Sequence, residues 1–220
     1  MKLSASLMCA DMTNLRAEIK ALDSAGIDSF HFDVMDGNFV PNYGFGYELI
    51  AQCRPLTPKL FVAHLMIEEP IRFIKEFAGA GIDVLIFHVE ACTDIFRTIA
   101  LIKEHGMSAG IALNPATSLD SIRYVLGGVD RVLLMTVEPG FSGQSYIPSM
   151  TNKAQELMTY INEKRFINLD IEVDGNMFHS TMSALHPLGI SHYVLGSSSL
   201  FAFGTNYQEC INSLRRGTSD

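Results

Sequence analysis

Residues 29–35 read Ser29-Phe30-His31-Phe32-Asp33-Val34-Met35, a short run rich in β-forming apolar residues. Upstream, residues 12–24 repeat apolar side chains every three to four positions, as an amphipathic helix does. Gly26 separates the two segments, at a place where a left-handed residue commonly ends a helix. A helical segment that alternates with a short apolar strand is typical of βα units around a parallel sheet.

The same alternation continues along the chain. Eight short apolar runs have the composition of strands, at residues 3–8, 29–35, 60–66, 84–89, 109–113, 131–137, 169–173 and 192–195. Amphipathic segments between them include residues 12–24, 71–80, 94–105 and 150–164. Eight βα units in 220 residues favour a closed barrel over an open doubly wound sheet. The expected fold is α/β, a (β/α)8 TIM barrel in which residues 1–220 form a single catalytic domain, with a frayed, solvated tail at residues 215–220.

The composition narrows the function classes. A formal net charge of -8 without a clustered basic stretch argues against a nucleic-acid surface. An anionic substrate is still possible, because backbone N–H groups can hold a phosphate locally. No segment is long enough to span a bilayer. The four cysteines are scattered without metal-site or disulfide spacing, so we expect a cytoplasmic protein.

The catalytic residues of such a barrel lie at the C-terminal ends of its strands. The second predicted strand carries His31 and Asp33 near its end, the third carries His64, and the seventh is followed by Asp174. Two imidazoles and two carboxylates at one rim suit a single divalent metal ion, for which Zn, Mn, Co and Fe(II) all qualify. Each residue alone has a plainer explanation, a hydrogen-bonded core histidine or a turn aspartate. The metal site is predicted because all four share one rim.

The other histidines are weaker candidates. His88 follows the fourth predicted strand and is either a residue that supports the metal ligands or an ordinary buried histidine. Surface or capping roles are expected for the remaining four, His105, His179, His186 and His192.

Glycine-rich turns follow the last three predicted strands and indicate a phosphate site, since loops there often bind phosphate in this fold. They contain Gly140, Phe141, Ser142 and Gly143, then Gly175 and Asn176, then Gly196, Ser197 and Ser198. Taken singly, each is equally well explained as an ordinary turn. Near the same rim, Met35, Met66 and Met135 either form an apolar wall beside the substrate or simply close the top of the barrel.

Taken together, these motifs resemble the ribulose-phosphate 3-epimerase family from residue 4 to about residue 203. The matching stretches are residues 6–8, 31–37, 39–42, 64–66, 135–144 and 173–175. Within the family, residues 7–11, 147–150 and 199–201 look more like the D-allulose-6-phosphate 3-epimerase branch. Two positions depart from the common pattern: Ala5 replaces a proline, and Asn176 replaces a second glycine after Asp174-Gly175. The second departure puts the chain length of the substrate in doubt.

The resemblance implies specific roles. His31, Asp33, His64 and Asp174 are then metal ligands, Asp33 and Asp174 also the acid/base pair, and Ser6 and His64 substrate contacts. Phosphate contacts are implied for Gly140 to Gly143, Gly175, Asn176, Gly196 and Ser197, and a further substrate contact for Ser198. The expected reaction converts D-allulose 6-phosphate to D-fructose 6-phosphate by two-base proton transfer at C3 through an enediolate, without an organic cofactor. The alternative substrate is D-ribulose 5-phosphate, converted to D-xylulose 5-phosphate.

Other function classes fit less well. A phosphosugar decarboxylase or aldolase on a related barrel would be expected to carry an Asp-x-Lys-x-x-Asp cluster at a strand end, which residues 31–36 and 63–66 lack. A non-catalytic phosphosugar-binding module would not need both Asp33 and Asp174. The expected partners are a sugar phosphate and further copies of the chain in a homo-oligomer, a dimer or a hexamer, with no nucleic acid and no membrane.

Overall fold

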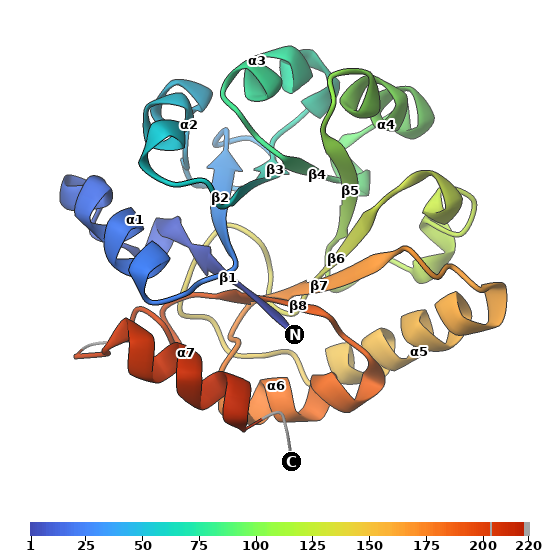
Figure 1. Ribbon diagram of the computed structural model, residues 1–220. Helices are drawn as coiled ribbons and strands as arrows, with labels where there is room; N and C mark the ends of the chain where they lie inside the picture. The colour runs from blue at the N-terminus through green and yellow to red at the C-terminus, as the bar shows by residue number, and fades with distance from the viewer. Residues whose placement is uncertain (203, 218–220) are drawn as a thin grey trace.

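A computed structural model describes residues 1–202 and 204–217 of the chain. Eight parallel strands close into a barrel in the order β1 to β8, so the predicted TIM barrel is confirmed (Figure 1). Three of the predicted strands have the same bounds as in the structure, and the others differ at their ends. The strands are β1 Lys2–Ser6, β2 Ser29–Met35, β3 Leu60–Met66, β4 Val84–His88, β5 Ser108–Leu113, β6 Arg131–Met135, β7 Asp170–Asp174 and β8 His192–Leu195.

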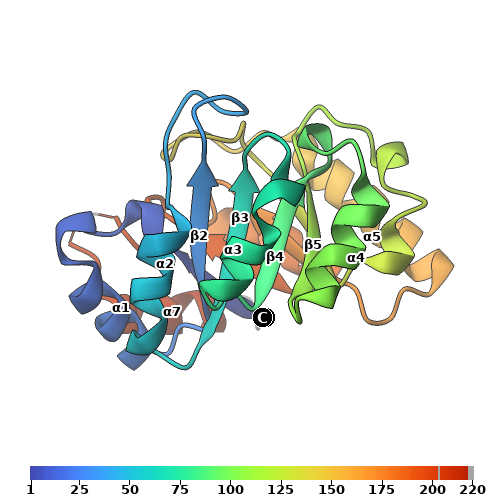
Figure 2. The ribbon, with the colours of Figure 1, turned by 90° about the horizontal axis from the view of Figure 1, so that it is seen from above.

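Helices surround the barrel (Figure 1). The α-helices are α1 Leu15–Ser24, α2 Tyr47–Cys53, α3 Ile74–Gly79, α4 Ile95–Glu104, α5 Ser149–Lys164, α6 His179–Leu185 and α7 Tyr207–Arg216. Short 3-10 helices lie at Leu7–Cys9, Met12–Asn14, Arg54–Leu56, Pro70–Phe73, Val89–Ala91, Leu119–Ser121, Leu126–Gly128 and His186–Leu188. Figure 2 shows the arrowheads of β2 and β3 pointing to the same end of the barrel, where the loop after β2 rises above the strands.

The connection between β5 and β6 differs from a regular βα unit. It contains only the 3-10 helices Leu119–Ser121 and Leu126–Gly128. Pro115 precedes the first of them and Gly127-Gly128 ends the second, and glycine is among the poorest helix formers. The two glycines therefore disfavour an α-helix at the end of this segment.

The buried apolar residues form two larger clusters and a third, small one of Met35, Val40 and Met66. The largest cluster packs between the outer faces of the strands and the helices, and it contains fully buried Phe30, Phe32 and Phe61. The second cluster lies inside the barrel and includes Val62, Ile86 and Leu133. Adjacent side chains of a strand point to opposite faces, so Phe32 enters the helix layer while His31 and Asp33 turn inward.

The two ends of the chain meet beside β2. Asp28 Oδ2 accepts hydrogen bonds from the backbone N–H of Leu3 and from the Arg215 guanidinium, each at 2.9 Å. Arg215 also donates to the Gly26 carbonyl at 2.9 Å. The expectation of a frayed tail is therefore wrong for Arg215, because a distant partner holds it; residues 218–220 lie outside the described part.

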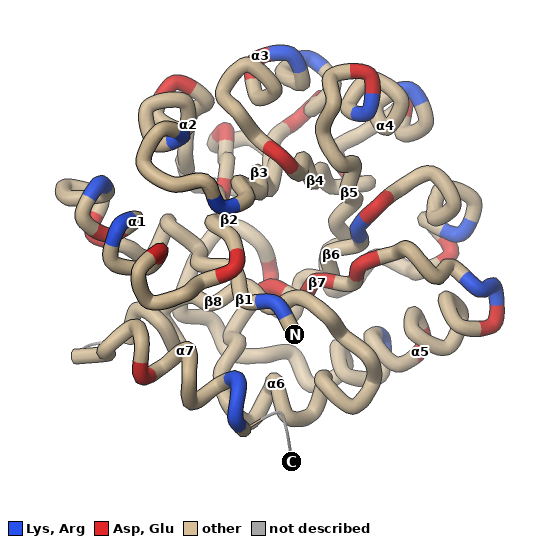
Figure 3. Tube along the Cα trace, viewed as in Figure 1, with Lys and Arg blue, Asp and Glu red and all other residues tan. Residues whose placement is uncertain are grey.

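Within residues 1–202 and 204–217, all Lys, Arg, Asp and Glu side chains except those of Asp33, Arg131 and Glu172 are at least partly exposed. Lys and Arg are spread over the helices and turns instead of gathering on one face (Figure 3). Among the described residues, every helix is too short or too polar to cross a membrane.

Candidate active site

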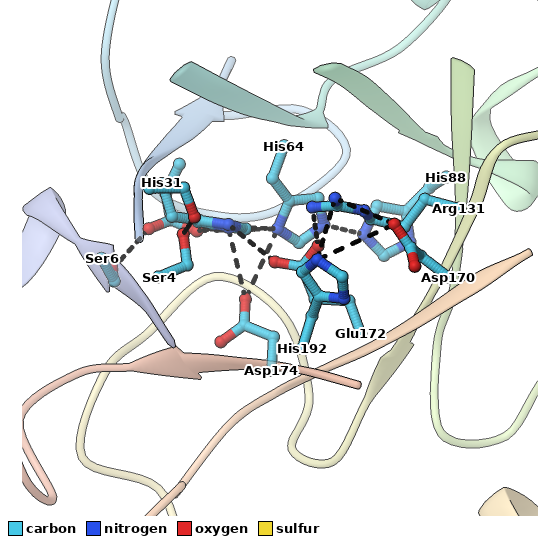
Figure 4. Close-up of polar contacts among 12 residues, drawn as sticks. Ser4, Ser6, His31, His64, His88, Arg131, Asp170, Glu172, Asp174 and His192 are labelled. Atoms are coloured by element: carbon cyan, nitrogen blue, oxygen red, sulfur yellow. Dashed lines mark hydrogen bonds and ion pairs between the residues drawn. The ribbon is translucent and has the colours of Figure 1, made fainter. Parts of the chain in front are cut away.

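Four side chains converge inside the C-terminal end of the barrel. They are His31 and Asp33 from β2, His64 from β3 and Asp174 from β7, and one donor atom from each lies within 4.8 Å of the others. Figure 4 shows His31, His64 and Asp174 turned toward one another. The structure thus brings together the four residues that the sequence predicts as metal ligands.

Strand register explains this convergence. In the parallel pairing of β2 with β3, Asp33 lies beside His64. His31 is two residues earlier on β2 and shares the inward face with Asp33. Asp174 comes from across the barrel, at the end of β7. Two adjacent strands and one distant strand therefore supply donors from different sides.

The donor atoms strongly favour a cation between them. His31 Nε2 lies 3.4 Å from Asp33 Oδ1, 3.6 Å from Asp174 Oδ2 and 3.3 Å from His64 Nδ1. Burial alone would lower the pKa of His31, but the carboxylates of Asp33, Glu172 and Asp174 raise it well above its usual value. Burial would raise the pKa of Asp33, but the facing histidines lower it.

This donor set fits a divalent metal. Mixed imidazole and carboxylate ligation is common for transition metals, and the field that holds a proton on His31 attracts a metal ion, which would displace that proton on binding. Ser6 fixes one ligand further: its buried Oγ donates to Asp33 Oδ2 at 2.7 Å. The other carboxylate oxygen of Asp33, Oδ1, faces His31 and His64.

A pocket opens above this cluster, and the turns after β6, β7 and β8 all line it. From the predicted substrate contacts, its lining contains Ser6, Gly140, Phe141, Ser142, Gly143, Asp174, Gly175, Asn176, Gly196, Ser197 and Ser198. His64, also predicted as a substrate contact, is fully buried and lies beneath the pocket, outside its lining. The structure therefore places His64 with the ligands.

Hydrogen bonds join the three turns. Asn176 Nδ2 donates to the Gln144 carbonyl at 2.7 Å, and Ser198 Oγ donates to the Met177 carbonyl at 3.2 Å. Asn176 has a positive φ of 55°, a conformation that asparagine tolerates better than most residues. This accounts for asparagine at a position where glycine is the usual family residue.

The three predicted methionines all line the pocket. Met35 and Met66 pair in the register of β2 and β3 and pack with Val40. Met135 ends β6 and packs with apolar residues inside the barrel. The pocket is therefore apolar beside the ligand cluster and polar at the turns.

Two further carboxylates lie behind the ligands, fully buried Glu172 and partly exposed Glu90, and neither has a role predicted from the sequence. Glu172 Oε1 lies 3.6 Å from His31 Nδ1, and its Oε2 accepts from Arg131 at 2.8 Å. Glu90 Oε2 lies 3.3 Å from Nδ1 of His88, whose own Nε2 is 2.8 Å from His64 Nε2. The sequence spacing could have indicated both carboxylates, because Glu172 is two residues before Asp174 and Glu90 is two residues after His88.

One of the weaker histidine candidates was misplaced. His192 begins β8, and its Nε2 lies 3.8 Å from Asp170 Oδ2 and 3.2 Å from Arg131. His192 therefore has a carboxylate neighbour. With Arg131 and Asp170 it forms a charged group at the N-terminal ends of β6, β7 and β8, and it does not lie on the surface.

Known proteins are similar in sequence to most of this chain. A family model described as the ribulose-phosphate 3 epimerase family matches residues 2–201. A ribulose-phosphate 3-epimerase of Bacillus subtilis (strain 168) is 45% identical over 197 residues, which cover 90% of this chain and 91% of the relative. Another from Synechocystis sp. is 42% identical over 212 residues, covering 96% and 91%. These names do not support the allulose 6-phosphate branch predicted from residues 7–11, 147–150 and 199–201.

Solved structures agree on the architecture. A 3-keto-L-gulonate-6-phosphate decarboxylase from Vibrio cholerae superimposes with a TM-score of 0.73, covering 99% of this chain and 96% of that one. Its identity to this chain is 13%, so this likeness shows the fold alone. The sequence relatives show more: the chain belongs to the ribulose-phosphate 3-epimerase family, a family of isomerases.

Proposed function

We propose that this protein interconverts D-ribulose 5-phosphate and D-xylulose 5-phosphate by moving the proton at C3 through an enediolate. The observation that best supports this is the pair of carboxylates from opposite sides of the barrel, Asp33 and Asp174, at the floor of one pocket. Inversion beside a ketone needs a base on one face of the substrate and an acid on the other.

Asp33 and Asp174 are suited to these two tasks. Asp33 is nearly buried and fixed by Ser6, whereas Asp174 is somewhat more exposed, with 16% of its side chain accessible. In each direction one carboxylate takes the C3 proton and the other delivers a proton to the opposite face. The pocket walls of Met35, Met66 and Met135 shield the reacting carbon from water.

His31, Asp33, His64 and Asp174 would hold one divalent metal ion, with Zn, Mn, Co and Fe(II) as the candidates. When bound, this ion would stabilise the negative charge that develops on the substrate oxygens. The proton transfers belong to the two aspartates. No organic cofactor is needed, because the reaction has no net oxidation or reduction.

The glycine-rich turns are suited to the phosphate. Gly140 to Gly143, Gly175, Asn176, Gly196 and Ser197 surround the open side of the pocket, and glycine permits close approach of backbone N–H groups to an anion. This lets a chain with a net charge of -8 bind an anionic substrate. Ser6 and Ser198, whose hydroxyl hydrogens are directed to Asp33 and to the Met177 carbonyl, can accept hydrogen bonds from the rest of the sugar.

A pentose substrate is favoured over a hexose. The named relatives quoted above are ribulose-phosphate 3-epimerases. Asn176, which had suggested a different chain length, uses its side-chain amide to hold the Gln144 carbonyl, a role in loop structure that requires no longer substrate. A homo-oligomer and a cytoplasmic location stay predictions from the sequence.

The test compares kcat/KM for D-ribulose 5-phosphate and D-allulose 6-phosphate on one metal-loaded preparation. We expect the pentose to be preferred by at least about tenfold, about 1.4 kcal/mol in transition-state free energy. Asn176→Gly serves as a companion variant and should keep the same preference. A preference of the same size for the hexose would overturn the assignment, and no turnover of either would reject the epimerase function.

A further inference from the structure

A chain of hydrogen-bonding groups runs outward from His64. His64 Nδ1 faces the proposed metal position, 3.6 Å from both Asp33 Oδ1 and Asp174 Oδ2. On the other side of the ring, His64 Nε2 lies 2.8 Å from His88 Nε2. His88 Nδ1 in turn lies 3.3 Å from Glu90 Oε2. Both histidines are fully buried, and these two contacts occupy both ring nitrogens of His88.

Glu90 is held as a hydrogen-bond acceptor. Its Oε1 accepts from the backbone N–H of Asn114 at 2.8 Å and from the Thr117 hydroxyl. The backbone N–H can only donate, so Oε1 must accept, and Oε2 is left to face His88. Lys153 of α5 fixes this loop by donating to the carbonyls of Asn114 and Pro115 at 2.9 and 3.1 Å, and to that of Thr117.

This arrangement dictates each tautomer in turn. A carboxylate oxygen opposite His88 Nδ1 requires a proton on that nitrogen, which leaves a lone pair on Nε2 of a neutral His88. That lone pair accepts from His64 Nε2–H. His64 then has its lone pair on Nδ1, the atom that faces the other three predicted ligands.

We infer that Glu90 and His88 are positioning residues that set His64 in the Nδ1 tautomer required of a metal ligand. The inference rests on the proposed metal site. Groups behind a ligating histidine commonly orient its ring and fix its tautomer, and here the control passes through a second histidine to a carboxylate on a different loop. Neither residue is part of the lining of the substrate pocket.

Replacing the Glu90 carboxylate with an amide should reverse the proton positions on both histidines. In Glu90→Gln, the amide oxygen must take the Oε1 position to accept from Asn114, which turns the NH2 group toward His88 Nδ1. The chain then reverses: His88 carries its proton on Nε2, and His64 is driven to carry its proton on Nδ1. The nearly isosteric variant should therefore be worse than Glu90→Ala, in which His88 is free to keep either tautomer.

Two measurements test this. Zn²⁺ affinity, from competition with a chelator, should fall by about 10- to 100-fold in Glu90→Gln, and by less in Glu90→Ala. In the Zn²⁺-loaded wild-type protein, long-range ¹H–¹⁵N spectra of the histidine rings should show His88 protonated at Nδ1 and His64 at Nε2. Asp83→Asn is the matched control, since Asp83 also accepts a backbone N–H, from Phe61 at 2.7 Å, but precedes β4 at the far end of the barrel; it should leave Zn²⁺ affinity unchanged.

The outcomes separate the inference from the proposed function. His88 protonated at Nε2 in the wild-type protein overturns the inference, and so does a Glu90→Gln variant that binds Zn²⁺ better than Glu90→Ala or no worse than Asp83→Asn. The spectra need only the wild-type protein, so they decide the matter even if a variant fails to fold. A wild-type chain that binds neither Zn²⁺ nor Co²⁺ would instead refute the metal site itself.

Discussion

His31 Nε2 and His64 Nδ1 face each other at 3.3 Å, with the carboxylates of Asp33 and Asp174 beside both. Two ring nitrogens at this distance need a proton or a metal ion between them, because their lone pairs otherwise repel. The two carboxylates add negative charge at the same point. This relationship is the physical basis for expecting a divalent cation in the barrel.

Removal of the metal should abolish epimerisation. Dialysis against a chelator, with residual metal verified by elemental analysis, is expected to lower kcat by at least about 100-fold, because the developing negative charge on the substrate loses its stabilisation. Adding back Zn²⁺, Mn²⁺, Co²⁺ or Fe²⁺ one at a time should restore activity to different degrees. Full activity in verified metal-free protein would contradict the metal's role.

Asp33→Asn and Asp174→Asn should each lower the rate of epimerisation by about 10²- to 10⁴-fold. Each variant should still exchange the C3 proton of one epimer with solvent deuterium, and the two variants should prefer opposite epimers. NMR at C3 measures this washout. Metal content is determined on the same samples, because both residues are also predicted ligands. Near wild-type interconversion by both metal-loaded variants would show that another group carries the proton.

Gly175→Ala should destabilise the fold more than Gly143→Ala. Both glycines have positive φ, 120° and 79°, so alanine is strained at either position, at about 1–2 kcal/mol. At Gly175 the added Cβ would also lie 2.6 Å from Val137 Cγ2, whereas at Gly143 nothing lies within 4 Å. The expected loss at Gly175 is about 3 kcal/mol or more. Urea unfolding of the two variants measures the difference, and equal losses would contradict this packing.

The strands were predictable because their chemistry is local. Residues 29–35 are buried on both faces and residues 60–66 nearly so, and their outward faces carry the apolar residues typical of parallel strands. The connection after β5 was not, because the failure of a helix there depends on Pro115 and Gly127-Gly128 interrupting an otherwise ordinary segment. The place of Arg215 was missed for a different reason: its partner, Asp28, lies at the opposite end of the sequence.

The ligand cluster was predictable because a barrel brings strand ends to one rim, so His31, Asp33, His64 and Asp174 needed only correct strands. The positions of the supporting carboxylates, Glu90 and Glu172, were not predictable in this way. Glu172 lies on the same inward face as Asp174, but its partner Arg131 comes from another strand, and neighbouring strands pair in a register that composition does not reveal. The preference for a hexose rested on short segments and on Asn176, whose side chain holds a loop.

Asp28 should make stability depend on pH in the acid range. Burial would raise the pKa of Asp28, but hydrogen bonds from Leu3 and Arg215 lower it below its usual value. A lowered folded-state pKa stabilises the fold above the unfolded value of about 3.9, and this contribution is lost as pH falls through the folded pKa. Asp28→Asn should therefore be less stable than wild type at about pH 7, and the gap should shrink toward about pH 2.

Urea unfolding of both proteins at several pH values measures that gap. The amide of Asp28→Asn can still accept from the Leu3 N–H, so the difference reports the charge and its contact with Arg215. A gap that stays constant down to about pH 2 would contradict the lowered pKa.

The fate of the C3 proton distinguishes epimerisation by two carboxylates on opposite faces from proton transfer by a single group. The metal-loaded wild-type protein is given D-ribulose 5-phosphate in D₂O, and product and remaining substrate are examined by NMR early in the reaction. We expect D-xylulose 5-phosphate to carry one deuterium at C3 while the remaining substrate is largely unlabelled, because separate groups remove and deliver the proton. Product that keeps the original C3 proton would contradict the two-carboxylate mechanism.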